Sequence, residues 1–153
     1  MMSNASPHAV AAREQKRKEA ASLGIDDQFV SNLVEQFYSR VRDDAELGPV
    51  FAVRIAHWPP HLEQMKRFWR SILFSSGEFV GSPMAKHIGI PELDRDLFVR
   101  WLKLFGDTLA ELGSPAAREH VLGKARMIAT SLLNGISIHR DGGFGLRTEE
   151  AFA

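Results

Sequence analysis

The sequence contains no cysteine. This absence excludes disulfide frameworks, cysteine zinc sites, iron–sulfur clusters and thiolate nucleophiles. Any metal would have to be held by histidine, methionine, tyrosine or carboxylate side chains. The sequence also lacks a phosphate-binding glycine loop, a GxSxG elbow, an HExxH motif and an EF-hand loop, so the common signatures of nucleotide, serine hydrolase, zinc protease and calcium chemistry are all missing.

A surplus of charge of either sign is absent too, because 19 Lys and Arg balance 19 Asp and Glu. Nucleic-acid-binding domains and polybasic membrane-surface proteins carry a basic surplus, so we expect neither kind of partner. No apolar run reaches the roughly 18–20 residues of a membrane span. Residues 1–23 show no apolar core of the signal-peptide type, and we therefore expect a cytoplasmic protein without membrane insertion.

What is present is the composition of an ordinary globular domain, with 44% hydrophobic and 25% charged residues in a chain of 153. Residues 1–24 are charged and offer little to bury, so we expect a flexible extension there. We expect a second flexible tail over residues 141–153, and one domain between them, over residues 25–140.

Apolar residues recur at helical spacing in four segments of this domain, which predicts an all-α fold. Asp26 or Asp27 is a candidate N-cap of the first helix, and Asp94 or Asp96 of the third. The second helix is expected to open at Pro59 and Pro60 and to end at Gly77. Gly48 and Pro49 are expected to break the chain after the first helix, and Ser114 with Pro115 to start the fourth. Between Gly81 and Pro91 only a short helical turn is expected, around residues 84–87.

His87 lies on that short turn. From spacing alone, a hydrogen-bonded loop histidine is the favoured interpretation and a metal ligand the less common one. His57 and His61 have i, i+4 spacing, but two prolines separate them and no carboxylate accompanies them, which argues against a zinc pair.

The helices carry many large aromatic residues for a domain of this size. Three residues, Tyr38, His61 and Trp101, place a polar tip on a face that is otherwise apolar. One interpretation is an ordinary core whose polar tips reach backbone partners, and periodicity alone favours it. The other is a pocket for a large flat apolar ligand, with the tips directed at a reactive centre.

Residues 37–51 read FYSRVRDDAELGPVF and resemble the FY-x-x-VR-x-D-x-x-LGP-x-F stretch of group III truncated haemoglobins, a family of bacterial globins. Four further segments resemble this family in the same order, and together they span about residues 25–140. They are His61 followed by Phe68 and Trp69, the G-x-P-x-x-x-H motif of residues 81–87, residues 98–105 and residues 125–129. The resemblance implies a truncated globin fold, which is a two-over-two helical sandwich around haem b.

The same resemblance assigns residues. It implies that His87 is the proximal ligand of the haem iron and that its second ring nitrogen donates to a backbone carbonyl or similar acceptor. It implies that Tyr38, His61 and Trp101 are the distal groups, with Tyr38 and Trp101 donating hydrogen bonds to bound O2 and His61 acting as a gate. Further positions match the apolar surroundings of the haem: Phe37, Phe51, Met65, Phe68, Trp69 and Phe98. Lys86, Arg54 and Arg67 are candidates for the propionate partners.

The function that the resemblance implies is binding of haem and of diatomic ligands, namely O2, NO and CO. NO dioxygenation with an unidentified reductase is the expected turnover, in a monomer or weak homo-oligomer. A peroxidase-like haem enzyme or a haem-based ligand sensor is the alternative, and a haem-free helical interaction module ranks third.

Overall fold

The computed structural model describes residues 6–141, which form seven helices and no strand. Five of them have 16 residues or more, and two short helices, α3 and α5, lie between the long ones. The bounds are α1 Pro7–Ser22, α2 Asp27–Asp43, α3 Leu47–Ala52, α4 Trp58–Phe74, α5 Pro83–Ile88, α6 Arg95–Leu112 and α7 Pro115–Asp141. The predicted all-α class is therefore confirmed. The predicted tail lies, from residue 142 onward, outside the described residues.

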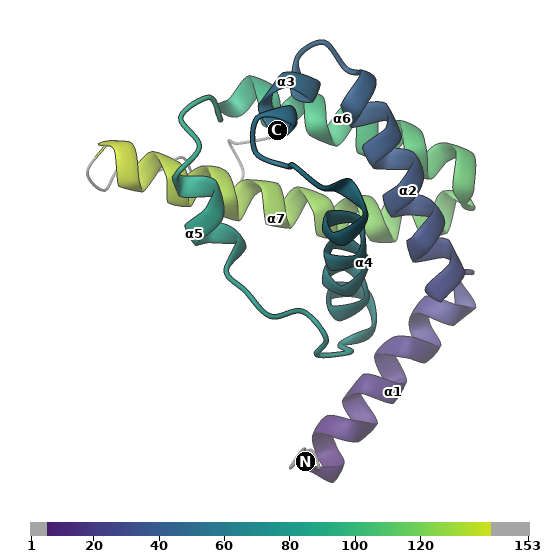
Figure 1. Ribbon diagram of the computed structural model, residues 1–153. Helices are drawn as coiled ribbons and strands as arrows, with labels where there is room; N and C mark the ends of the chain where they lie inside the picture. The colour runs from purple at the N-terminus through teal and green to yellow at the C-terminus, as the bar shows by residue number, and fades with distance from the viewer. Residues whose placement is uncertain (1–5, 142–153) are drawn as a thin grey trace.

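Four long helices form the body as two packed pairs. Helix α2 contacts α4, α6 contacts α7, and α2 also lies against α6, which joins the two pairs. Figure 1 shows α4 in front of α7, and α5 beside the C-terminal half of α7. This is the two-over-two arrangement that the family resemblance implied.

Helix starts follow the predicted capping residues. The side chains of Asp26, Asp94 and Ser114 accept hydrogen bonds from the backbone N–H three residues later, at 2.8, 2.9 and 3.1 Å. A side-chain oxygen at this position satisfies one of the four N–H groups that a helix start leaves without partners. Two aspartates were proposed as caps for each of the first and third predicted helices, and in both cases the earlier one is the cap.

Two predicted helix ends are wrong in position. The break expected at Gly48 and Pro49 comes earlier, around Asp44, and both residues lie inside α3. Pro49 is tolerated there because it occupies the first turn, where its missing N–H is not needed. Helix α4 ends at Phe74 rather than at Gly77, because Ser75 adopts a left-handed conformation with φ 53°.

The N-terminal segment forms the helix α1, whose N-terminal end points away from the other helices (Figure 1). Only its last turns are anchored: Ala20 is buried, and the Arg17 guanidinium lies 4.8 Å from the centre of the Phe74 ring on α4. Most of α1 is exposed, as the charged sequence predicts. Whether residues 1–24 are flexible stays a prediction.

Buried apolar residues form two clusters rather than one. The larger joins α1, α2, α4, α6 and the first half of α7, and includes Phe37, Trp69 and Phe105. The smaller joins α6 to the second half of α7 and includes Phe98 and Leu132. The partly buried side chains of Leu97 and Ile128 contact both clusters, and the cavity described next takes its walls from both.

Candidate functional site

A cavity of about 450 Å³ lies between the two clusters. This volume is within the range of ligand and cofactor sites, roughly 300–1,000 Å³. Its wall is made mainly of aliphatic and aromatic side chains from α2 to α7. The residues that line it are Tyr38, Leu47, Val50, Phe51, Arg54, Ile55, His61, Gln64, Met65, Phe68, Trp69, Phe79, Pro83, Lys86, His87, Gly89, Ile90, Leu93, Leu97, Phe98, Trp101, Ile128, Ala129 and Leu132.

Tyr38 and Trp101 line this cavity from α2 and α6. Phe37 sits behind both, with its ring edge-on to Tyr38 at 5.0 Å and to Trp101 at 5.4 Å between ring centres. Phe105 stacks on the other side of Trp101 at 5.1 Å. Burial raises the pKa of the Tyr38 phenol well above its ordinary value, so the hydroxyl keeps its proton. Neither the Tyr38 O–H nor the Trp101 N–H has a hydrogen-bond partner within residues 6–141.

His61 lies in the first turn of α4, with its ring edge-on to Tyr38 at 5.3 Å. Its Nε2 atom is buried and has no partner among the described residues. Burial, and the positive charge of Lys86, lower the pKa of His61, so the ring stays neutral at pH 7. A buried polar atom without a partner is costly in a water-free interior, so a ligand in the cavity that hydrogen-bonds His61 Nε2 would remove this cost.

His87 reaches the same cavity from α5. Ser82 caps this helix by accepting from the Ala85 N–H at 3.2 Å, and Pro83 occupies its first position. The His87 Nδ1 atom lies 2.6 Å from the Pro83 carbonyl oxygen. That acceptor makes Nδ1 the protonated nitrogen, which leaves the Nε2 lone pair of the ring available. The predicted backbone acceptor for His87 is therefore present.

The structure brings nine of the ten predicted site residues together at the cavity. Tyr38, Phe51, His61, Met65, Phe68, Trp69, His87, Phe98 and Trp101 all line the cavity. Phe37 does not. It is fully buried behind the wall, where its ring contacts both Tyr38 and Trp101.

Several wall residues were not predicted as site residues. Leu97, Ile128 and Leu132 belong to the helical apolar patterns of α6 and α7, so periodicity marked them as buried but not as cavity-lining. Trp58 does not line the cavity, but its contact with two lining residues was also missed. It lies within 5.6 Å of His61 and 5.9 Å of Tyr38 between ring centres, and the Arg42 guanidinium lies over it at 4.7 Å. A tryptophan directly before two prolines gave no sign of this contact.

Basic groups lie at the edge of the cavity. Arg54 and Lys86 belong to its lining, and Arg54 also binds Glu92 at 2.7 Å. Arg67 does not line it; it lies in an adjacent hollow with Gln64 and Phe79. Within residues 6–141 no three or more His, Asp or Glu side chains lie close enough to form a metal site of their own. A metal at His87 would therefore have to bring further ligands with it.

Comparison with known proteins decides the family. No protein-family model matches the chain. A curated group 3 truncated haemoglobin of Campylobacter jejuni is 32% identical over 114 residues, which are 72% of this chain and 90% of that protein. The chain belongs to the group III truncated haemoglobins. The crystal structure of a group III truncated haemoglobin from the same organism is similar with a TM-score of 0.70 and 31% identity, over 78% of this chain and 96% of that one.

Membership of the truncated haemoglobins confirms the family resemblance and the truncated globin fold, and it implies a haem group for this globin. None of the helices in residues 6–141 combines the length and apolarity needed to cross a membrane.

Proposed function

We propose that this truncated haemoglobin binds haem b in the cavity and uses it to bind O2 and NO, with His87 as the protein ligand of the iron. The observation that supports this most is the geometry of His87. Its Nδ1 is engaged by a backbone carbonyl at 2.6 Å, and its other nitrogen has no partner within the described chain. Histidines that bind metals almost always donate their second N–H in this way, which sets the tautomer and the ring orientation.

The residues present fit a haem group. The wall is apolar over most of its area, which suits the flat ring of haem. The cationic side chains of Arg54 and Lys86 lie among the lining residues, where they could pair with the propionate carboxylates of haem. With no cysteine in the chain, the haem would be held without covalent bonds. When bound, its ferrous iron supplies reversible binding of diatomic ligands.

The chain contributes hydrogen-bond donors on the other wall. Neither the Tyr38 hydroxyl nor the Trp101 N–H has a hydrogen-bond partner among the described residues, so they lose no protein partner when they donate to a ligand. Donors fixed in a site without water stabilise developing negative charge more strongly than water does. Two such donors slow the release of O2, which suits chemistry on O2 better than its transport. His61, in the first turn of its helix, would control entry.

The turnover we propose is NO dioxygenation, in which O2, NO and one electron from a reductase give nitrate. Peroxidase-like activity is the weaker candidate, because the partner of His87 is a neutral carbonyl and not a carboxylate that would make the imidazole more electron-donating. The cytoplasmic location and the monomeric or weakly oligomeric state stay predictions.

Absorption spectroscopy of the purified protein tests the haem proposal. We expect a Soret band that shifts on reduction with dithionite and again on addition of CO. Acidic butanone should extract the whole chromophore, because nothing attaches it covalently. A protein without a Soret band, which also gains none on addition of haemin, would contradict the proposal and favour a haem-free helical module.

A further inference from the structure

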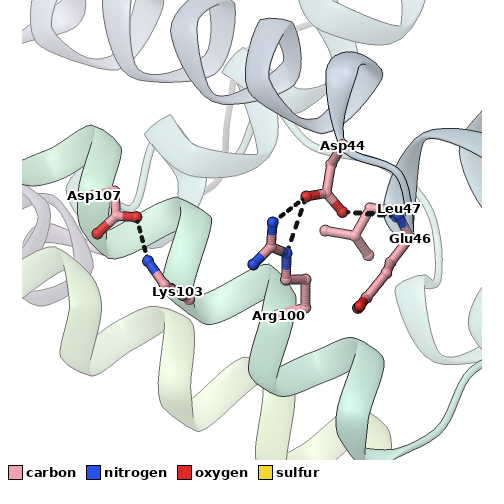
Figure 2. Close-up of polar contacts among 6 residues, drawn as sticks. All are labelled: Asp44, Glu46, Leu47, Arg100, Lys103 and Asp107. Atoms are coloured by element: carbon pink, nitrogen blue, oxygen red, sulfur yellow. Dashed lines mark hydrogen bonds and ion pairs between the residues drawn. The ribbon is translucent and has the colours of Figure 1, made fainter.

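Asp44 is the aspartate of the FY-x-x-VR-x-D motif, and the haem chemistry proposed above assigns it no role. It follows the last residue of α2, and its carboxylate is buried, with only 4% of the side chain exposed. All the contacts of this carboxylate are made by charged or backbone donors. Figure 2 shows that it joins three parts of the chain: the end of α2, the start of α3 and the middle of α6.

One carboxylate oxygen of Asp44 faces α6. Its Oδ1 accepts from the Arg100 guanidinium, from Nε at 2.9 Å and from Nη2 at 2.5 Å. Arg100 is the residue directly before Trp101. The ion pair therefore connects the end of the helix that carries Tyr38 to the turn of α6 that carries Trp101.

The other oxygen of Asp44 holds α3. Its Oδ2 accepts from the backbone N–H groups of Glu46 at 3.1 Å and Leu47 at 2.9 Å, which satisfies the start of that helix. The corner is tight, because a Cβ at Gly48 would lie 2.9 Å from the Arg42 carbonyl oxygen. Leu47, Val50 and Phe51 of α3 all line the cavity, so the same carboxylate also locates this wall.

We propose that the Asp44–Arg100 ion pair is a positioning device for ligand discrimination: by holding the α2–α3 corner on α6, it sets where the Tyr38 hydroxyl and the Trp101 N–H lie relative to each other. The inference rests on the proposed haem function. Aromatic contacts alone leave this spacing free to slide, because edge-to-face packing through Phe37 has no fixed direction comparable to that of paired N–H···O bonds. Two donors act on one diatomic ligand only if both are placed to within a fraction of an ångström.

The effect on ligands tests the positioning role. In Asp44→Asn, O2 dissociation should become faster by about tenfold, the change expected when a hydrogen bond to a partly charged acceptor is lost. CO dissociation should change by less than about twofold, because bound CO carries less negative charge for a donor to stabilise. Arg100→Gln should act in the same direction while leaving both α3 caps of Asp44 in place. The double variant should be no worse than the stronger single one, since both remove one interaction.

A second measurement does not depend on haem. Tyr38 is the only tyrosine of the chain, so incorporated 3-fluorotyrosine gives one ¹⁹F resonance that reports on this ring alone. We expect Asp44→Asn and Arg100→Gln to shift or broaden this resonance in both the apoprotein and the holoprotein. A pair that only stabilises the fold would lower the urea midpoint and leave the native resonance where it is.

Asp107→Asn is the matched control. It removes the exposed Lys103–Asp107 contact of 2.9 Å, which lies on the same helix and joins no second element (Figure 2). The control should leave the resonance and both dissociation rates unchanged. An unshifted resonance together with an unaltered ratio of O2 to CO dissociation rates in Arg100→Gln would overturn the positioning role. A wild-type protein that binds no haem would instead overturn the proposed function on which the role rests. Because the ¹⁹F resonance is measured in the apoprotein as well, it tests the positioning role separately from haem binding.

Discussion

The two walls of the cavity are built in opposite ways. The wall that carries Tyr38 and Trp101 belongs to long helices with a deep core: α2 alone has seven buried residues, and a stack of Trp101, Phe105 and Trp69 continues behind it. The wall that carries His87 is a helix of six residues with none buried. The first wall owes its shape mainly to packing, with the Asp44–Arg100 pair as a directional link at its α2–α3 corner. The second owes it to hydrogen bonds and to a single supporting helix.

Contacts within α5 and contacts of this segment with α7 locate the His87 wall, and the partly buried Ile88 and Ile90 pack against the smaller cluster. The Pro83 carbonyl engages the His87 ring, Met84 lies on Gly135 of α7, and Arg140 of α7 donates to the carbonyls of Leu93, Ile90 and Pro91 at 2.5, 2.8 and 3.2 Å. A Cβ at position 135 would lie 2.2 Å from the Met84 sulfur, so this glycine permits the close approach of α5 to α7. A site of this kind is easier to disturb than a packed core, because few buried contacts resist its local opening.

Removing the ligand atom should have the largest effect. We expect His87→Ala to lose most of its haem, or to keep it without a normal five-coordinate ferrous spectrum. Absorption spectra after expression and after titration with haemin check this. The control is His8→Ala, an exposed histidine of α1. Wild-type spectra in the His87 variant would remove His87 from its role.

Removing the whole haem should lower stability more than any surface change. Haem bound only to the folded protein adds about 4 kcal/mol when present at a thousand times its dissociation constant. For a chain of this size we expect the melting temperature of the apoprotein to fall by roughly 10 °C. Scanning calorimetry of apo and holo protein measures it, and a dye that binds exposed apolar surface should bind only the apo form. Equal midpoints would contradict a haem-filled space between the two clusters.

Tyr38→Phe tests the packed wall. The ring stays, and only the hydroxyl is lost, so packing against Phe37 is preserved. The loss of a hydrogen bond to a partly charged acceptor, about 1.5–3 kcal/mol, should speed O2 dissociation by roughly 10- to 100-fold. Stopped-flow measurements check this, with Ser39→Ala, the neighbouring exposed hydroxyl, as control. Unchanged release of O2 would transfer the donor role to Trp101, His61 or water.

Arg140→Met tests the wall held by hydrogen bonds. It should free the segment after α5 and weaken haem binding by about fivefold, which corresponds to about 1 kcal/mol for a net loss of hydrogen bonding at a partly exposed site. The rate of haem transfer to an excess of apomyoglobin measures this. Arg126→Met is the control, because Arg126 is exposed on the same helix and makes no hydrogen bond or ion pair with residues 6–141. Equal transfer rates would show that the contact of Met84 with Gly135 is enough to hold α5 in place without Arg140.

The smallest effect expected is a change in acid sensitivity. Hydrogen bonds from Arg100, followed by those from the Leu47 and Glu46 N–H groups, hold the pKa of Asp44 below its ordinary value. The stabilisation by Asp44 is therefore complete above about pH 4, the ordinary aspartate pKa, and is lost as the pH falls through the lower folded pKa. In urea unfolding, Asp44→Asn should be less stable than wild type at pH 7, and the difference should shrink toward pH 3. A difference independent of pH would mean that packing, and not charge, accounts for it.

Much of this protein could be predicted from local patterns. Local patterns predicted the caps at Asp26, Asp94 and Ser114 and the short helix around His87. A cap, a proline at a helix start and an apolar period each act within a few residues of the chain. Family resemblance added the residues of the site. Of these, Phe37 is the one that tertiary structure places behind the wall, and a period of 3.6 residues does not distinguish a cavity-lining side chain from one a layer deeper.

The sequence by itself therefore determined the long helices and most of their starts, because a cap, a proline or an apolar period depends on neighbours along the chain. His87 was singled out by the family resemblance and not by its spacing. Tertiary structure decided the rest. These tertiary features are the division of the core into two clusters, the contacts of Trp58 with Tyr38 and His61, the Asp44–Arg100 pair, and the hydrogen bonds from Arg140 to the segment after α5. The Asp44–Arg100 pair alone joins residues 56 positions apart. Such contacts form only when whole helices pack, since their energy depends on the distance between elements and not on the local order of residues.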